Sequence, residues 1–187
     1  CKAVMCIDPV FLKTKQEWVE YAMVSLTHMD FPYVLVFIMG VSKQADKVVN
    51  CAVEYARNHQ DSVILVGDQE RWYKYRNVKH YGVASPREFI NLIDGASCVF
   101  TNSFHATAFS IILNTPFYTE INIQNSERIE HLLEITGLVP RSMYDGKIDT
   151  FNMSEIEWEK VEEKLKSEIE ISKSYLMNAI EGDYTIE

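Results

Sequence analysis

The sequence lacks the features that mark several large classes of protein. Its four cysteines, Cys1, Cys6, Cys51 and Cys98, form no C-x-x-C pair and have no histidine at metal-ligand spacing, so we expect reduced thiols and no metal site. No run of about 18 apolar residues occurs and no signal-peptide pattern is visible, so we expect no membrane-spanning helix. The expected location is cytoplasmic, either free or peripheral at the inner face of the membrane.

Basic residues are also in short supply. The chain has 18 Lys and Arg against 27 Asp and Glu, which gives a formal net charge of −9. Proteins that bind nucleic acid neutralise its phosphates with a basic surface. We therefore expect no nucleic-acid partner.

The remaining composition is that of a folded domain. Of the 187 residues, 47% are hydrophobic, which is enough to bury a core without disulfides or a metal. The length predicts a single domain over residues 1–187. The sequence begins without Met, inside a predicted strand at residues 3–7, so we expect it to be the later part of a longer protein whose N-terminal domain is missing.

Short apolar runs alternate with helical periodicity along the chain. The runs predict buried strands, and apolar residues three and four positions apart predict amphipathic helices. Ser85, Pro86 and Glu88 predict a capped helix start, and Gly95 marks the end of that helix. The predicted strands span residues 33–40, 62–67, 97–101 and 117–121, and the other predicted helices span residues 45–56, 104–113, 126–136 and about 154–182.

This alternation predicts an α/β fold with a mainly parallel, doubly wound sheet. Such sheets bind ligands beyond the carboxyl ends of their strands, where each strand turns into a helix. The candidate turns are those that follow residues 40, 67, 101 and 121.

The turn after Thr101 contains the strongest candidate site. Asn102 and Ser103 are good N-cap residues, and the first turn of a helix exposes N–H groups that suit a phosphate or a carboxylate. His105 lies in this turn and can donate a hydrogen bond to an anion or transfer a proton near neutral pH. The alternative is a neutral, partly buried His105 that a backbone carbonyl satisfies, and composition alone leaves both interpretations open.

A second candidate follows the next strand. Arg128 lies in the first turn of a predicted helix, and Glu120 lies near the end of the strand before it, so we expect both at the same edge of the sheet. Arginine binds carboxylate and phosphate through a planar fork, and a neighbouring acid can orient it or accept a hydroxyl proton. The alternative is an ordinary surface pair between Arg128 and Glu120 or Glu127.

Other chemically active residues have weaker support. Residues 71–76 alternate basic and aromatic side chains, which can stack on a sugar or nucleotide ring but more often cover a core. Cys98 lies within a predicted buried strand, which argues against a thiolate nucleophile paired with His105. The remaining histidines are interpreted as structural or solvated: His28, His59, His80 and His131.

Several segments occur in an order that is more specific than any one of them. They are residues 8–12 (DPVFL) with Glu17 and Trp18, 82–89 (GVASPREF), 101–110 (TNSFHATAFS), 114–117 (NTPF), 126–129 (SERI), 132–133, 137–138 and 174–176. The segment in which Ser103, Phe104 and His105 open a helix is the most telling. Together these segments resemble the polysaccharide pyruvyl transferase family, over nearly the whole chain.

The resemblance implies a fold and an activity. It implies the C-terminal half of an enzyme with two Rossmann-like domains, arranged as in GT-B glycosyltransferases, and this half is expected to be inactive alone. Members of the family transfer the enolpyruvyl skeleton of phosphoenolpyruvate to a sugar diol, which gives a pyruvate ketal and phosphate during polysaccharide or cell-wall assembly. Phosphoenolpyruvate is then the donor substrate, a carrier-linked or polysaccharide sugar is the acceptor, and neither a cofactor nor a metal is implied.

The resemblance also implies roles for individual residues. His105 matches the family's histidine, so it is expected to contact the donor and to act as general acid. Some relatives have arginine where Ser103 stands and many have glycine where Ala106 stands, so we expect Arg128 to supply the positive charge. The amides of residues 103–106 are expected to hold phosphate. The expected substrate-binding residues are Asn102, Ser103, Phe104, Ala106, Glu120 and Arg128.

Two other functions stay open at this point. One is a GT-B glycosyltransferase donor domain that uses a nucleotide sugar, which requires an acidic contact to the ribose, and Glu120 is its one candidate. The other is a non-catalytic Rossmann-like binding module in which His105 has a structural role.

Overall fold

A computed structural model describes residues 5–23, 29–40, 43–67, 70–121, 126–148 and 155–181. Within these residues a six-stranded sheet has the order β3-β2-β1-β4-β5-β6, and each neighbouring pair is parallel. The strands are β1 (Tyr33–Phe37), β2 (Ser62–Val66), β3 (Lys79–Gly82), β4 (Cys98–Thr101), β5 (Phe117–Glu120) and β6 (Ser142–Met143).

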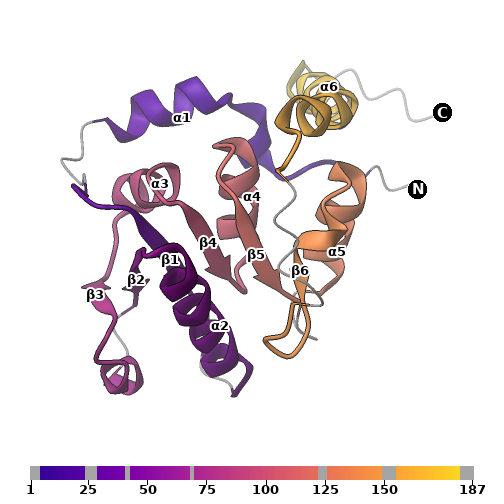
Figure 1. The fold of residues 1–187 in the computed structure, drawn as a ribbon. Helices are drawn as coiled ribbons and strands as arrows, with labels where there is room; N and C mark the ends of the chain where they lie inside the picture. Colours follow the sequence, from indigo (N-terminus) through magenta and orange to yellow (C-terminus); the bar gives the residue numbers. More distant parts are fainter. Residues whose placement is uncertain are drawn as a thin grey trace.

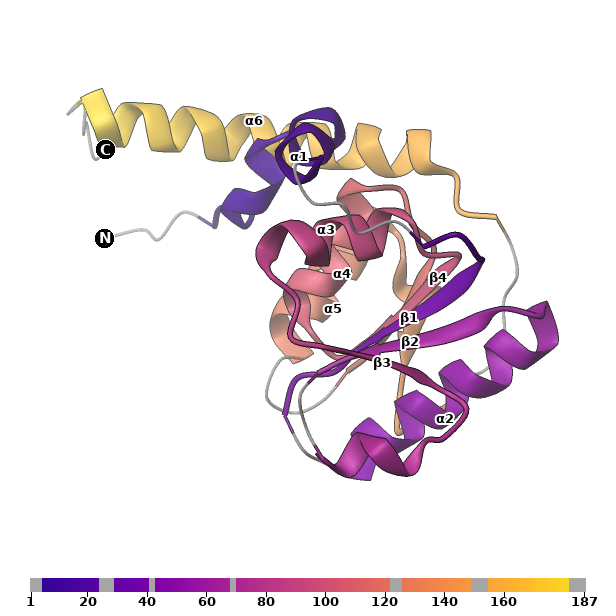
Figure 2. The same ribbon diagram turned by 90° about the vertical axis from the view of Figure 1, so that its left-hand side faces the viewer.

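Helices cover both faces of this sheet (Figure 1). Figure 2 shows α2 on one side of the strands and α3, α4 and α5 on the other. The α-helices are α1 (Lys15–Ala22), α2 (Lys43–His59), α3 (Pro86–Asp94), α4 (Phe104–Ile112), α5 (Ser126–Thr136) and α6 (Trp158–Glu181), and the 3-10 helices are η1 (Pro9–Leu12), η2 (Glu70–Lys74) and η3 (Val139–Arg141). The expected doubly wound α/β fold, which is Rossmann-like, is confirmed.

The central strand β1 shows why two layers of helices form. Its side chains alternate between the faces, and all three of Val34, Leu35 and Val36 are fully buried. Val34 and Val36 pack into the core that contains α2, whereas Leu35 packs into the core that contains α3, α4 and α5. A strand that is apolar on both faces needs helices on both faces.

The start and end of α3 agree with the sequence signals. Ser85 is the N-cap, and its side chain accepts a hydrogen bond from the Glu88 amide. The Glu88 carboxylate accepts the Ser85 amide in return at 2.8 Å, which completes the capping box, and Gly95 is the C-cap.

Some elements differ from the sequence expectations. Residues 5–7 of the expected first strand form no secondary structure, and residues 3 and 4 lie outside the described part of the chain. The Ile7 amide donates instead to Ser172 Oγ of α6 at 2.9 Å, so this segment pairs with a helix side chain and not with the sheet. The expected C-terminal helix begins at Trp158, and residues 154 and 182 lie outside the described part of the chain.

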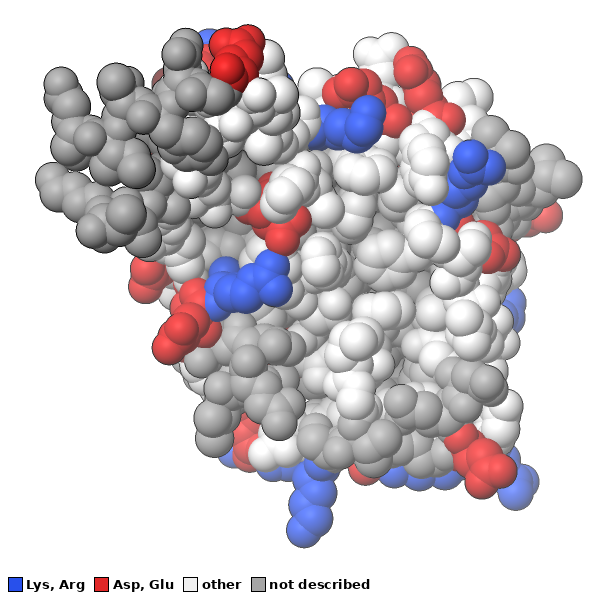
Figure 3. Space-filling model, turned by 180° about the vertical axis from the view of Figure 1, so that it is seen from behind, with Lys and Arg blue, Asp and Glu red and all other residues white. Residues whose placement is uncertain are grey.

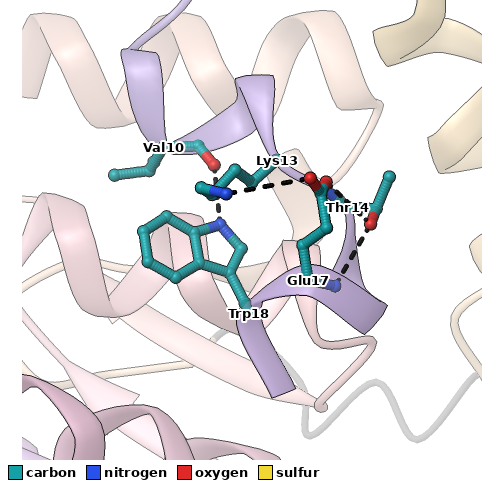
Figure 4. A network of polar contacts seen from close by, with 5 residues as sticks. All are labelled: Val10, Lys13, Thr14, Glu17 and Trp18. Carbon is teal, nitrogen blue, oxygen red and sulfur yellow. Dashed lines mark hydrogen bonds and ion pairs between the residues drawn. The ribbon is translucent and has the colours of Figure 1, made fainter. Parts of the chain in front are cut away.

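A brace between η1 and α1 fixes the course of the N-terminal segment (Figure 4). The indole N–H of Trp18 donates to the Val10 carbonyl at 2.9 Å. Thr14 and Glu17 form the capping box that starts α1. The Trp18 ring also packs edge-on against Phe109 of α4, with 5.0 Å between ring centroids, so the brace ties η1 to the main body.

Among the described residues, no helix has both the length and the apolar character needed to cross a membrane.

Candidate functional site

The turn from β4 to α4 lies where the strand order of the sheet reverses, between β1 and β4. Thr101 shapes this turn, because its hydroxyl donates to the Phe37 carbonyl at 2.6 Å and accepts the Ser103 amide at 2.9 Å. Asn102 ties the turn to the loop after β1. Its Oδ1 accepts the Met39 amide at 2.7 Å, and its Nδ2 donates to the Met39 carbonyl at 2.9 Å. The Asn102 side chain, expected to bind substrate, thus holds two loops together.

Only part of the expected amide cradle is open to a ligand. Ser103 is the N-cap of α4, and its hydroxyl accepts the Ala106 amide at 3.5 Å, so the amides of Ser103 and Ala106 already have protein acceptors. Among the described residues, no acceptor is recorded for the amides of Phe104 and His105. These two N–H groups, at the positive end of the helix dipole, are the ones available to an anion.

His105 and Arg128 meet at a carboxylate that the sequence interpretation did not single out as a site residue. Arg128 Nη2 lies 2.8 Å from Asp8 Oδ2, and His105 Nε2 lies 3.9 Å from the same oxygen. The side chain of Asp8 is 15% exposed, whereas those of His105 and Arg128 are 55% and 58% exposed. The carboxylate therefore lies beneath two groups that face solvent.

Phe104 completes this cluster. The Arg128 guanidinium lies over the Phe104 ring, with 3.9 Å from Cζ to the centroid. The Phe104 ring also meets the His105 ring edge-on, with 5.5 Å between centroids. We call Asp8, Phe104, His105 and Arg128 the Asp8 cluster; it joins the N-terminal segment, α4 and α5.

A cavity of about 650 Å³ adjoins the Asp8 cluster. Asp8, Phe104 and Arg128 form part of its wall, and α6 closes one side through Glu168. Its lining combines apolar side chains with a few charged ones, which suits a small polar ligand or part of a larger one. The other lining residues are Met5, Cys6, Ile7, Pro9, Glu127, His131, Leu132 and Ile135.

Glu120 does not join this cluster. It is buried, and its two carboxylate oxygens accept the amides of Asp145 and Gly146 at 2.8 and 2.9 Å. Burial raises the pKa of Glu120 above its ordinary value, and the two amide hydrogen bonds oppose that shift. The alternative of a surface pair between Arg128 and Glu120 does not occur, because Arg128 bonds Asp8 and Glu120 closes the turn after β6.

Other candidates are accounted for by the core. Cys98 is fully buried in β4, and burial raises the pKa of its thiol to about 12, which excludes a reactive thiolate. Trp72 is buried against the α2 side of the sheet, so residues 71–76 cover the core at this tryptophan. His59 stacks on Tyr55, as expected of a structural residue. His131, which was interpreted as structural or solvated, lines the cavity instead.

Sequence reasoning gave Asp8 no role in the site because its partners are remote in the chain. One local signal was present: Asp8 precedes Pro9, and it is the N-cap of η1, where Oδ1 accepts the Val10 amide at 3.1 Å. Within the described residues, no group of three or more His, Cys, Asp or Glu side chains is arranged to hold a metal ion.

Comparison with known proteins decides the family. The sequence model of the polysaccharide pyruvyl transferases matches residues 1–119. The chain belongs to the polysaccharide pyruvyl transferase family. Asp8, Phe104 and His105 lie within the matched part, and Arg128 lies beyond it. A search of the curated proteins found no match.

The solved structures of similar fold include two of another enzyme. UDP-GlcNAc 2-epimerase from Methanocaldococcus jannaschii is 15% identical over 81% of this family member, with a TM-score of 0.47. The same enzyme in complex with UDP-GlcNAc and UDP is 15% identical over 84% of the chain, with a TM-score of 0.50. The chain spans 42% and 44% of those two structures. At this identity the likeness shows the Rossmann-like fold alone.

Proposed function

We propose that this chain supplies the donor side of an enzyme that transfers the enolpyruvyl skeleton of phosphoenolpyruvate to a sugar diol and forms a pyruvate ketal. Membership of the polysaccharide pyruvyl transferase family supports the reaction class. The single observation that supports the location is that His105 and Arg128 converge on Asp8 beside the cavity. The proposed acceptor is a sugar of a polysaccharide or of a carrier-linked precursor.

Each group of the site has a task in this reaction. The free N–H groups of Arg128 and the amides of Phe104 and His105 face the phosphate or carboxylate of the donor. His105, as imidazolium, gives its proton to the methylene carbon of phosphoenolpyruvate. The neighbouring carbon becomes oxocarbenium-like, one sugar hydroxyl attacks it, and phosphate leaves as the second hydroxyl closes the ketal. One hydroxyl proton restores His105, and the other leaves with phosphate.

The site on this chain leaves room for a second partner. Arg128 and Asp8 offset each other, so a donor with phosphate and carboxylate groups needs positive charge from elsewhere. On the face formed by α3, α4 and α5, basic and acidic side chains lie next to one another around a broad uncharged surface (Figure 3). We propose that a second, N-terminal domain completes the site, that the chain alone is inactive, and that the complete enzyme works in the cytoplasm or at the inner membrane surface without a metal or a cofactor.

Calorimetric titration of the chain with phosphoenolpyruvate, UDP-GlcNAc and inorganic phosphate tests the donor. We expect phosphoenolpyruvate to bind more tightly than phosphate, and UDP-GlcNAc not to bind. If UDP-GlcNAc binds and phosphoenolpyruvate does not, the result supports the nucleotide-sugar alternative. That alternative loses its acidic ribose contact in this structure, because both Glu120 oxygens are occupied by backbone amides.

His105→Ala in the complete enzyme tests the chemistry. We expect ketal formation, followed as the new methyl signal in proton NMR, to fall by at least about a hundredfold, since general acid catalysis contributes on the order of 10²–10⁴. His80→Ala is the matched control, because His80 lies exposed on the edge strand β3. Full activity of the His105 variant would remove this residue from the mechanism, whereas a wild-type enzyme that forms no ketal would favour the non-catalytic module.

A further inference from the structure

We propose that Asp8 is a positioning residue, which holds the His105 imidazole and the Arg128 guanidinium in the orientation that the donor requires; this inference rests on the proposed function. Asp8 contacts no reacting atom in this scheme. It acts through the two groups that lie above it, at 3.9 and 2.8 Å from one of its oxygens.

The two carboxylate oxygens of Asp8 have different partners. Oδ1 accepts the Val10 amide, which fixes the carboxylate plane against η1. Oδ2 is then the oxygen left for Arg128 and His105, so both side chains are directed to one atom. The distance of 3.9 Å between His105 Nε2 and Asp8 Oδ2 is longer than a hydrogen bond, so Arg128 is the group that Asp8 bonds directly and His105 lies next to that pair.

The support beneath Asp8 is rigid. Pro9 fixes the backbone at the first position of η1, and Phe11 buries the same short helix in the core. Trp18 holds the Val10 carbonyl from α1 (Figure 4). The Asp8 carboxylate is therefore held more firmly than the two exposed side chains next to it. We infer that Asp8 orients His105 and Arg128, and not the reverse.

Orientation matters because both groups have a second functional end. With Nε2 of His105 directed to Asp8, Nδ1 of the same ring is the nitrogen that remains for substrate. With Nη2 of Arg128 on Asp8 and its flat face on Phe104, the side chain is still 58% exposed, so its other N–H groups can reach a substrate. A fixed carboxylate below an imidazole is a known way to make proton transfer efficient.

Asp8→Asn is a sharp test because asparagine keeps the N-cap. Asn and Asp cap helices about equally well, so Oδ1 can still accept the Val10 amide. The other terminal atom then becomes an NH₂ donor, which faces the donors of Arg128 and His105 and accepts from neither. The variant removes the orienting contact and leaves the local backbone in place.

Steady-state kinetics of the complete enzyme measure the consequence. We expect kcat for ketal formation to fall at least about tenfold in Asp8→Asn, since loss of an orienting carboxylate under a catalytic histidine can cost up to about 10⁴. KM for phosphoenolpyruvate should not rise, because the variant removes a negative charge next to the anion site. The variant is first shown to be fully folded by circular dichroism. A lower kcat with an unchanged KM in such folded enzyme then indicates a positioning role, because a merely structural role would not produce that combination.

The matched control is Asp94→Asn, since Asp94 also pairs with one cation, Lys15, at 3.7 Å but belongs to α3. We expect kcat and KM of this variant to equal those of the wild type. Wild-type kcat in Asp8→Asn, or a raised KM with unchanged kcat, overturns the proposal.

Crystal structures of the chain and of its Asp8→Asn variant separate this inference from the proposed function. We expect the Arg128 guanidinium and the His105 ring to leave their shared position in the variant, and unchanged positions overturn the inference whatever the activity. If the wild-type enzyme forms no ketal but both side chains are displaced, the proposed function fails and the positioning contact stands.

Discussion

At Glu120, a single buried carboxylate shows how a candidate site residue becomes a structural one. The acid stands at the carboxyl end of β5, where ligands of such sheets bind. The turn after β6 lies over it, and the amides of Asp145 and Gly146 donate to its two oxygens. The pairing of Lys47 with Asp145 holds this turn from α2. Glu120 therefore replaces missing backbone partners of a turn instead of binding ribose or a sugar hydroxyl.

Glu120→Gln gives a pH-dependent prediction. Burial raises the folded-state pKa of Glu120 above its ordinary 4.5, so the folded state binds the proton more tightly than the unfolded state. The contribution of this group to stability is present below the unfolded pKa and is lost as pH rises through the folded pKa. We expect the free energy of unfolding of the wild type, minus that of the variant, to decrease with rising pH in urea denaturation series. A difference that grows with pH would contradict the assignment.

Among the elements, α3 begins at an N-cap whose hydrogen bond depends on a single side-chain oxygen, that of Ser85. Ser85→Ala deletes the hydroxyl that accepts the Glu88 amide, and we expect a loss of about 0.5–2 kcal/mol in the free energy of unfolding. Ser85→Thr is the matched control, because threonine keeps the hydroxyl and the capping box, so we expect little loss. Urea denaturation of both variants measures the difference, and equal losses would show that the cap contributes little.

The second half of α6 has little packing against the rest of the protein. Val161, Leu165 and Ser172 are buried, whereas residues 173–181 have no buried side chain among them. In Figure 2, α6 runs across one end of the molecule and continues beyond the helices beneath it. A helical end of this kind gains no tertiary stabilisation, so it is marginal on its own.

Hydrogen exchange tests this difference within one helix. We expect backbone amides of residues 174–181 to exchange faster than those of residues 162–172, because local opening of the unpacked end exposes no buried surface. NMR-detected exchange of the isolated chain measures both groups in one sample, so the first half of α6 is the internal control. Equal protection along the helix would mean that something covers its second half in solution.

The elements that the sequence predicts well are those with a strong apolar signal. β1, β2 and β4 are largely apolar runs, and α3 has both a cap and a stop. β3 has exposed and half-buried side chains because it is an edge strand, so it has no such run, and the two-residue β6 is too short to leave one. The described part of the expected strand at residues 3–7 fails for the opposite reason, since Ile7 packs against the core and bonds α6 without joining the sheet.

The candidate site divides in the same way. His105 was identifiable because the signals of a strand end and a helix start surround it. Asp8 was not, because its contacts with His105 and Arg128 join parts of the chain that meet only after the sheet and α1 have formed. Local patterns locate a turn, whereas only the fold shows which remote carboxylate lies beneath it.

For the molecule as a whole, the two cores share one sheet. Trp72 reports on the core around α2, and Trp18 reports on the core around α3, α4 and α5. Because β1 contributes Val34 and Val36 to one core and Leu35 to the other, neither core can lose its packing while the strand stays in place for its neighbour. The cores should therefore unfold as one cooperative unit.

Two tryptophan variants test that single-domain behaviour. Trp18→Phe with Trp158→Phe leaves Trp72 as the sole tryptophan, and Trp72→Phe with Trp158→Phe leaves Trp18. Within each variant, we expect the urea midpoint from fluorescence to coincide with that from far-ultraviolet circular dichroism, even if the two variants differ in stability, because loss of either core disrupts β1 and hence the whole sheet. The circular dichroism curve of each variant is its own control. A fluorescence midpoint for Trp72 that precedes the loss of secondary structure would mean that the α2 layer opens as a separate unit, and the site around Asp8 would then rest on the α3–α5 layer alone.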